Sequence, residues 1–370
     1  MACNNWTLQG ELDDYQYRVS RLNINNNYVI KGAAGSGKSI LALQRAKYLQ
    51  EIGETDYYVI VYTRTLRKFI EDGIRYYNID SNRILYEYEW RSRQGCPEAD
   101  YFIIDESQDF TESEIRLFKS KARKSIIFFG DTVQQLYRTK NVNGTEEETV
   151  TTRRIEEIIQ REAESLIFNY RLPKTIARCA ELINPTAYDL EERCRSSVTT
   201  KPIIKTCSNW KQEMDFIINT IRLENLDCVG ILVPTNANVE KVYDYLNQNG
   251  MTAEVRLRNE EQNILRMNFG NDNPKIMTYW SSKGLQFDTV FLPFCEASGD
   301  FYKNPLYVAL TRTSNQLFIT HSNSISSFLN PLLQRTDFFN RDNSPVRAIN
   351  QNINTRPIQH FDENTDDLPF

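Results

Sequence analysis

The chain has 370 residues, of which 40% are hydrophobic and 25% charged, and its formal net charge at pH 7 is −5. This length and apolar content predict two ordinary domains. The acidic balance excludes an overall basic field, so any contact with nucleic acid has to come from a local groove. The seven cysteines contain no Cys-x-x-Cys pair, which argues against a zinc site and a disulfide framework and favours reduced thiols.

The first half of the chain alternates short β-branched and aromatic runs with segments of helical period. Strands are expected at residues 28–30, 57–62, 101–104, 126–129 and 166–169, with helical patterns such as 66–75 and 112–120 between them. This alternation is typical of a parallel sheet covered by helices. No apolar run approaches the roughly 20 residues of a membrane span, and the N-terminus lacks a signal pattern, so we expect a cytoplasmic protein without membrane contact.

A glycine-rich loop, "KGAAGSGKS", follows the first expected strand and precedes a helical pattern. Its spacing fits the P-loop, in which backbone N–H groups face the phosphates, the lysine reaches the β and γ oxygens, and the serine ligates Mg²⁺. The loop predicts a nucleotide site with Ser39 as a metal ligand. Its residues are Gly32, Ala33, Ala34, Gly35, Ser36, Gly37, Lys38, Ser39 and Ile40.

Acidic residues end another expected strand in "YFIIDESQD". Asp105 can hold Mg²⁺ through its coordination shell, and the adjacent Glu106, pointing the other way, can polarise an attacking water. Together with Lys38, these two side chains are the predicted catalytic core on the first half of the chain.

The second half begins a new alternation near residue 201. Expected strands lie in "PIIKTC", "CVGILVPT", "KIMTYW", "TVFLPF" and "QLFITHS", and "NVEKVYDYLNQNG" is an expected helix closed by Gly250. Between the halves, the charge and Asn/Gly content of residues 139–154 predict an exposed loop. The predicted division is 1–195 for an N-terminal ATPase domain, 196–339 for a C-terminal domain and 340–370 for a polar, acidic tail.

Several stretches together resemble the UvrD/Rep/PcrA-like superfamily 1 helicases. Besides "DESQD", the matching segments occur along the chain in the order of that family: "LDDYQ", "VYTRTLRKFI", "GDTVQQLY", "NYRLP", "TYWSSKGLQFDTVFLP" and "LYVALTRTSNQLFI". The resemblance spans residue 16 to about residue 321. It implies an α/β fold of two tandem RecA-like P-loop lobes with parallel sheets and an ATP cleft between them.

The resemblance also implies roles in ATP binding. Gln16 would lie against the adenine edge and Tyr170 would stack on adenine. Gln286, in the same motif as Gly284, could bond a ribose hydroxyl where the family has glutamate.

Three further residues are implied to act on the γ-phosphate. Gln134 would be the sensor between the phosphate and the DNA groove, Arg171 would meet the phosphate, and Arg312 would be the arginine finger. A guanidinium suits this work because it stays charged and can bond two phosphate oxygens.

Single-stranded DNA would contact both lobes. The segment "VYTRTLRKFI" resembles motif Ia of the family, which touches the single strand through Thr63, and Arg64, Tyr137 and Trp280 are candidate stacking platforms. Ordinary packing is an equal alternative for Tyr137 and Trp280. Trp280 also stands where the family has histidine, a departure that bears on DNA coupling.

The intervals 63–105 and 255–275 are too short to hold the accessory subdomains of full helicases. We therefore predict Mg²⁺-dependent ATP hydrolysis coupled to single-stranded DNA binding and translocation, in a multi-subunit complex whose partner could be a nuclease subunit; bacterial antiviral defence systems are an analogy. The alternative is a nucleotide-gated regulatory ATPase that switches or assembles a partner enzyme on DNA ends without unwinding. A small-molecule or nucleoside kinase is a third reading, but it would need neither "DESQD" nor an arginine from a second lobe.

Overall fold

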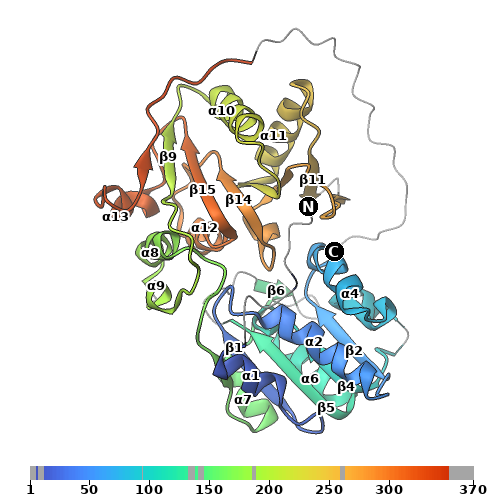
Figure 1. Cartoon of the computed structure of the whole chain (residues 1–370). Helices are drawn as coiled ribbons and strands as arrows, with labels where there is room; N and C mark the ends of the chain where they lie inside the picture. The colour runs from blue at the N-terminus through green and yellow to red at the C-terminus, as the bar shows by residue number, and fades with distance from the viewer. Residues whose placement is uncertain are drawn as a thin grey trace.

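The computed structural model describes residues 6, 12–93, 95–131, 138–140, 146–185, 189–258 and 263–349. Two α/β lobes are stacked on each other (Figure 1). Within the described ranges, no helix combines the length and the apolar content needed to cross a bilayer.

The first lobe is built on a parallel sheet with strand order β3-β2-β4-β5-β1-β8. Its strands are β1 (Tyr28–Gly32), β2 (Tyr57–Val61), β3 (Ile84–Tyr86), β4 (Ala99–Ile104), β5 (Ala122–Gly130) and β8 (Glu164–Leu166). In a parallel sheet all carboxyl ends meet at one edge, which is where α/β proteins bind ligands. The loops after β1, β2, β4 and β5 therefore share one edge of this lobe.

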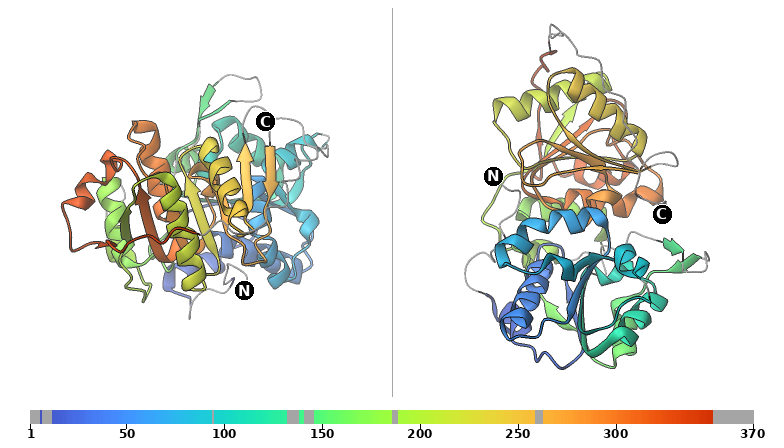
Figure 2. Two further views of the ribbon diagram at one scale, coloured as in Figure 1. Left: turned by 90° about the horizontal axis from the view of Figure 1, so that it is seen from above. Right: turned by 90° about the vertical axis from the view of Figure 1, so that its right-hand side faces the viewer.

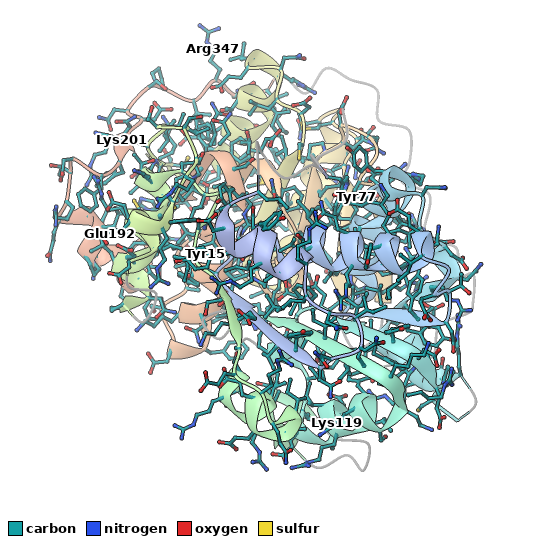
Figure 3. The ribbon with its side chains drawn as sticks, turned by 60° about the horizontal axis from the view of Figure 1, so that its bottom comes forward. Tyr15, Tyr77, Lys119, Glu192, Lys201 and Arg347 are labelled. Atoms are coloured by element: carbon teal, nitrogen blue, oxygen red, sulfur yellow. The ribbon has the colours of Figure 1, made fainter. Side chains whose placement is uncertain are left out.

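Helices cover both faces of the first sheet because side chains alternate between faces along each strand. The helices of the lobe are α1 (Asp14–Ser20), α2 (Lys38–Glu51), α3 (Arg64–Phe69), α4 (Glu71–Tyr77), α5 (Glu87–Ser92), α6 (Glu112–Lys121) and α7 (Thr152–Ile159). Helices α2 and α4 share a core with Val59 and Ile103, whereas α5, α6 and α7 pack with Ile60 and Phe102. Lys119 lies beside α7 (Figure 3) and donates a 2.5 Å hydrogen bond to the carbonyl of Ile158.

The second lobe has an eight-stranded sheet of order β12-β11-β13-β10-β14-β15-β9-β16, in which only the β11–β12 pair is antiparallel. Its strands are β9 (Ile203–Thr206), β10 (Val229–Val233), β11 (Glu254–Arg258), β12 (Asn263–Arg266), β13 (Lys275–Thr278), β14 (Phe287–Leu292), β15 (Thr313–His321) and β16 (Asn340–Arg341). The helices are α8 (Lys174–Ile183), α9 (Leu190–Arg193), α10 (Trp210–Leu223), α11 (Asn236–Gln248), α12 (Lys303–Leu310) and α13 (Asn330–Leu333).

In both sheets, two strands that are consecutive in the sequence are not neighbours in the sheet, because strands from later in the chain lie between them. Strands β4 and β5 separate β1 from β2, and β13 separates β10 from β11. This arrangement confirms the predicted fold class, an α/β protein of two tandem RecA-like lobes.

The chain leaves the first sheet earlier than the sequence suggests. The first sheet ends with β8 at Leu166, and α8 packs against α12 and α13 of the second lobe, beside α9 (Figure 1). The passage thus lies near residue 170 rather than 195. The polar run that suggested residue 195 is a connector within the second lobe, where Glu192 and Lys201 are labelled in Figure 3.

The start of the predicted tail is also part of the second lobe. Strand β16 pairs with β9, and Asp342 lies 3.3 Å from the buried ammonium of Lys205. The Lys205 ammonium also donates to the carbonyl of Ser344. Residues 340–349 therefore pack on the sheet edge, and the remainder of the predicted tail lies outside the described residues.

Two local predictions were wrong. Residues 139–154 were expected to form an exposed loop, but Val150 is buried, its N–H bonds to the carbonyl of Phe110, and α7 begins at Thr152. The β6–β7 hairpin (Arg138–Lys140 and Glu146–Glu148) projects from the first lobe (Figure 2). Cys228 is disulfide-bonded, contrary to the expectation of reduced thiols, whereas five other described cysteines are free.

Candidate functional site

The loop between β1 and α2 has the shape of a phosphate cradle. Gly35 and Gly37 adopt φ values of +77° and +90°, which side-chain-bearing residues rarely adopt. The Lys38 ammonium lies inside the loop, 2.7 Å from the carbonyl oxygen of Gly32 and 3.1 Å from that of Ala33. The hydroxyl of Ser36 is buried and has no hydrogen-bond partner among the described residues. Ala34 and Ile40 complete the loop and the first turn of α2.

Ser39 and Asp105 meet although they come from different elements. The Ser39 hydroxyl donates a 2.6 Å hydrogen bond to Asp105 Oδ2. Burial, together with the nearby Glu106 carboxylate, raises the pKa of Asp105. A hydroxyl and a carboxylate beside a phosphate loop form the oxygen donor set that Mg²⁺ prefers. The residues present therefore fit Mg²⁺-ATP, and Ser39 and Asp105 are the side chains that would hold the metal.

Glu106 is buried at the end of β4 in a left-handed backbone conformation, with φ of +54°. Such a conformation costs a non-glycine residue about 1–2 kcal/mol. Burial alone would raise the pKa of Glu106, but the charges of Lys283 and Lys38, a hydrogen bond from Gln108 and the charge of Arg312 lower it overall. The carboxylate is therefore kept ionised, as a general base requires.

Two arginines lie next to each other between the lobes. Burial and the charge of Arg312 lower the pKa of Arg171 to about 9. Thr311 joins the two side chains, because its carbonyl accepts a 2.9 Å bond from Arg171 Nη2 and its hydroxyl a 3.0 Å bond from Arg312 Nη2. Arg171 Nε is buried without a hydrogen-bond partner among the described residues. Two buried like charges favour an anion between or beside them.

The predicted adenine-side residues contact the P-loop itself. The Gln16 amide donates a 3.2 Å bond to the carbonyl of Ser36, and its own carbonyl also caps α1. The Tyr170 N–H bonds to the carbonyl of Gly35, and its hydroxyl donates to Asp13. Gln16 and Tyr170 are thus on one side of the loop, although their predicted roles toward adenine remain predictions.

The second-lobe turn that contains Lys283 and Gly284 contacts the first lobe at the carboxyl ends of its strands. The Lys283 ammonium is 2.5 Å from Asp109 Oδ1, and these side chains are only 3% and 2% exposed. A methyl group on Gly284 would lie 3.6 Å from Glu106 Oε1 and 3.0 Å from Leu66 of α3. Gln286 is half-buried two residues farther along.

The described DNA candidates lie on both lobes. Thr63 follows β2 and caps α3 through a 3.1 Å bond from the N–H of Leu66, and Arg64 is exposed beside it. Trp280 packs against Phe301, with ring centroids 4.8 Å apart, and Phe301 is 70% exposed. Gln134 and Tyr137 lie outside the described residues, so their predicted roles remain predictions.

Lys283 of the second lobe and its ion-pair partner Asp109 were assigned no role from the sequence, although both fall inside segments that carry the family resemblance. Gln108 was also missed: it donates a 2.5 Å bond to Glu106 and accepts a 2.9 Å bond from the N–H of Asp131. The only signal was their position in those segments, because the contact itself joins residues 174 apart in the chain.

Comparisons with known families match both lobes. Residues 19–140 match a family described as the AAA domain, and residues 276–320 match the UvrD-like helicase C-terminal domain. A candidate ATP-dependent DNA helicase of Acanthamoeba polyphaga mimivirus is 23% identical over 270 residues, which are 64% of this chain. The match covers 36% of that relative, so the chain corresponds to only part of the relative's length.

Two solved structures are also similar. The C-terminal domain of a possible DNA helicase from Lactobacillus plantarum is 17% identical, with a TM-score of 0.37 over 46% of this chain and 98% of that domain. The PRRSV helicase is 15% identical, with a TM-score of 0.45 over 83% of this chain and 54% of that protein.

The family matches fall in the expected order, one on the lobe with the P-loop and the other on the lobe with Lys283 and Arg312. The chain therefore resembles the UvrD-like superfamily 1 helicases.

Proposed function

We propose that the chain hydrolyses Mg²⁺-ATP between its two lobes and couples each cycle to binding and translocation of single-stranded DNA. The observation that carries this proposal is the convergence of charges around Glu106. Lys38 comes from the P-loop, whereas Lys283 and Arg312 come from the second lobe, and all three lower the pKa of the same carboxylate.

Each side chain has a chemical task in this scheme. The P-loop N–H groups and Lys38 bind the phosphates, and Ser39 and Asp105 would hold Mg²⁺, which would supply positive charge to the phosphate oxygens. Glu106 orients and deprotonates the attacking water. Arg171 and Arg312 stabilise the charge that develops on the transferred phosphoryl group, and Gln134 is the proposed sensor of that group.

Hydrolysis converts ATP to ADP and inorganic phosphate, and release of that phosphate removes the anion that brings the two arginines toward the first lobe, so the lobes can separate after each turnover. A strand bound to Thr63 and Arg64 on one lobe and to Trp280 on the other would then be moved. Tyr137 is proposed as a further stacking residue on the first lobe. Stacking contributes about 1–3 kcal/mol per base without selecting sequence.

The short intervals between motifs leave no room for a duplex-separating subdomain, which supports work within a multi-subunit complex. A partner such as a nuclease subunit would supply strand separation or cleavage, and antiviral defence is one proposed setting.

The test is the rate of ATP hydrolysis by the purified chain with and without single-stranded DNA. We expect single-stranded DNA to increase the rate of ATP hydrolysis strongly. Lys38→Ala should abolish ATP hydrolysis both with and without DNA. Normal turnover in Lys38→Ala would contradict the assignment of the P-loop.

Trp280→Ala distinguishes DNA coupling from packing. It should weaken the stimulation by single-stranded DNA more than the basal rate, because its role is in strand binding. An equal loss of both rates would show that Trp280 only packs against Phe301. Stimulation by a partner protein but not by DNA would instead favour the nucleotide-gated regulatory ATPase.

A further inference from the structure

One buried ion pair joins the two lobes outside the set of phosphate-binding residues. Lys283 belongs to the turn that precedes β14, and Asp109 ends the 3₁₀ turn Ser107–Asp109 that follows Glu106. Their charged atoms are 2.5 Å apart, and both side chains are almost fully buried. Buried ion pairs are weak evidence for stability, because desolvation offsets much of their attraction. A role in placing the two lobes is therefore worth testing.

The second-lobe side of this contact is a tightly bonded turn. The N–H of Lys283 bonds to the carbonyl of Trp280, and the N–H of Leu285 bonds to that of Ser282. The Ser282 hydroxyl donates a 2.7 Å bond to the carbonyl of Tyr279. Gly284 has φ of +77°, so the turn can approach Glu106 and Leu66 without a side chain between them.

On the first lobe, Asp109 is also held in a network of hydrogen bonds. The N–H of Asp109 bonds to the carbonyl of Glu106 at 3.0 Å. Gln108 links the Glu106 carboxylate to the N–H of Asp131, which follows β5. Holding Asp109 therefore holds the backbone of Glu106 and the polar network around it.

We propose that the Lys283–Asp109 ion pair seats the 280–284 turn of the second lobe on the first lobe, and that Lys283 is a positioning residue for Glu106. The pair sets where Gly284 lies over the Glu106 carboxylate. The same turn begins with Trp280. Single-stranded DNA bound at Trp280 can therefore change the position of Glu106 through the four rigid residues that follow Trp280 in the turn. The effect on turnover rests on the proposed ATP hydrolysis, but the seating of the turn does not.

The experiment uses Asp109→Asn and Lys283→Met, with hydrogen exchange and ATP turnover measured on the whole chain. Exchange should become faster in both segments 105–110 and 280–287, because each loses its partner across the lobes. Turnover should fall about 10²-fold, as expected for a base displaced by about 1 Å. The KM for ATP should change little, because the P-loop is untouched. The double variant should lose no more than either single variant, because both remove the same contact.

Lys275→Met is the matched control. Lys275 is also a buried lysine, 3.4 Å from Glu254, but both residues belong to the second lobe. Its loss should alter exchange near residues 254–275 and leave segment 105–110 unchanged.

The proposal is overturned if segment 105–110 keeps its protection in Asp109→Asn and Lys283→Met, or if Lys275→Met changes it equally. Additive losses of turnover in the double variant would also overturn it, as would full turnover despite faster exchange. If the wild-type chain hydrolyses no ATP, the proposed function fails, whereas the exchange data still decide whether the ion pair seats the turn.

Discussion

Each lobe buries a glutamate near the carboxyl edge of its sheet, but the two carboxyl groups are shifted in opposite directions. The pKa of Glu106 is lowered, because two lysines and an arginine outweigh the effect of burial. Burial raises the pKa of Glu213, and the charge of Glu296 adds to this effect. The N–H of Phe294 at 3.0 Å and the hydroxyl of Thr320 at 2.6 Å donate to the Glu213 carboxyl group without outweighing burial. Burial is common to both sites, so the neighbouring cations decide which carboxyl group can serve as a base.

The two buried glutamates also show that the lobes have different roles. The first lobe holds the proposed base, Glu106, and the P-loop, and the second lobe supplies Lys283 and Arg312 as cations near Glu106. At its own edge, the second lobe uses Glu213 to join α10 to the ends of β14 and β15.

Arg312→Ala should have the largest effect on the first-lobe site. Loss of an arginine finger lowers turnover by about 10³- to 10⁵-fold, whereas ATP should still bind through the P-loop. Single-turnover hydrolysis and nucleotide binding measure the two effects. Turnover close to wild type would show that the charge of Arg312, 1% exposed and bonded within its own lobe, does not act on phosphate.

Glu106→Gln tests the base directly. The amide keeps the hydrogen-bonding shape but cannot take a proton, so turnover should fall by about 10²- to 10⁴-fold. ATP binding should persist, and the lobes should remain together with nucleotide bound. Unchanged turnover would place the base elsewhere.

Glu213→Gln should have the smallest effect, limited to stability. Because the folded state raises the pKa of Glu213, this group lowers stability as pH rises from its unfolded pKa through its folded pKa. The variant should therefore melt at a higher temperature than wild type at pH 8, and the difference should vanish toward pH 4. ATP turnover should not change.

Glu296→Gln, in the same lobe, should shift the melting temperature at pH 8 in the opposite direction. Hydrogen bonds from Asn323 and Ser322 outweigh burial and lower the pKa of Glu296, so its replacement should reduce the melting temperature at pH 8. Equal shifts in Glu213→Gln and Glu296→Gln would contradict the electrostatic explanation.

The sequence predicted those parts of the site that depend on local patterns. The P-loop and the acidic strand end were placed correctly because strand, turn and helix signals are contiguous in the chain. The meeting of Ser39 and Asp105 also followed, since parallel strands bring their carboxyl ends to one edge.

Contacts between distant segments could not be predicted in this way. The Lys283–Asp109 pair joins two lobes, and no periodicity or spacing encodes it. The lobe boundary was misplaced for a related reason: α8 reads as an ordinary amphipathic helix, and its sequence does not indicate which sheet it covers. The edge strand β16 has only two residues and was missed because it is too short for a pattern.

The position of α8 has a practical consequence for dissecting the molecule. A fragment ending at residue 195 would retain α8, whose Ile176, Ala177 and Ala180 are fully buried in the whole chain, while removing α12 and α13, which pack against this helix. That uncovered apolar stripe would make the isolated N-terminal piece prone to self-association. Cutting close to residue 170 instead keeps α8 in the same fragment as α12 and α13.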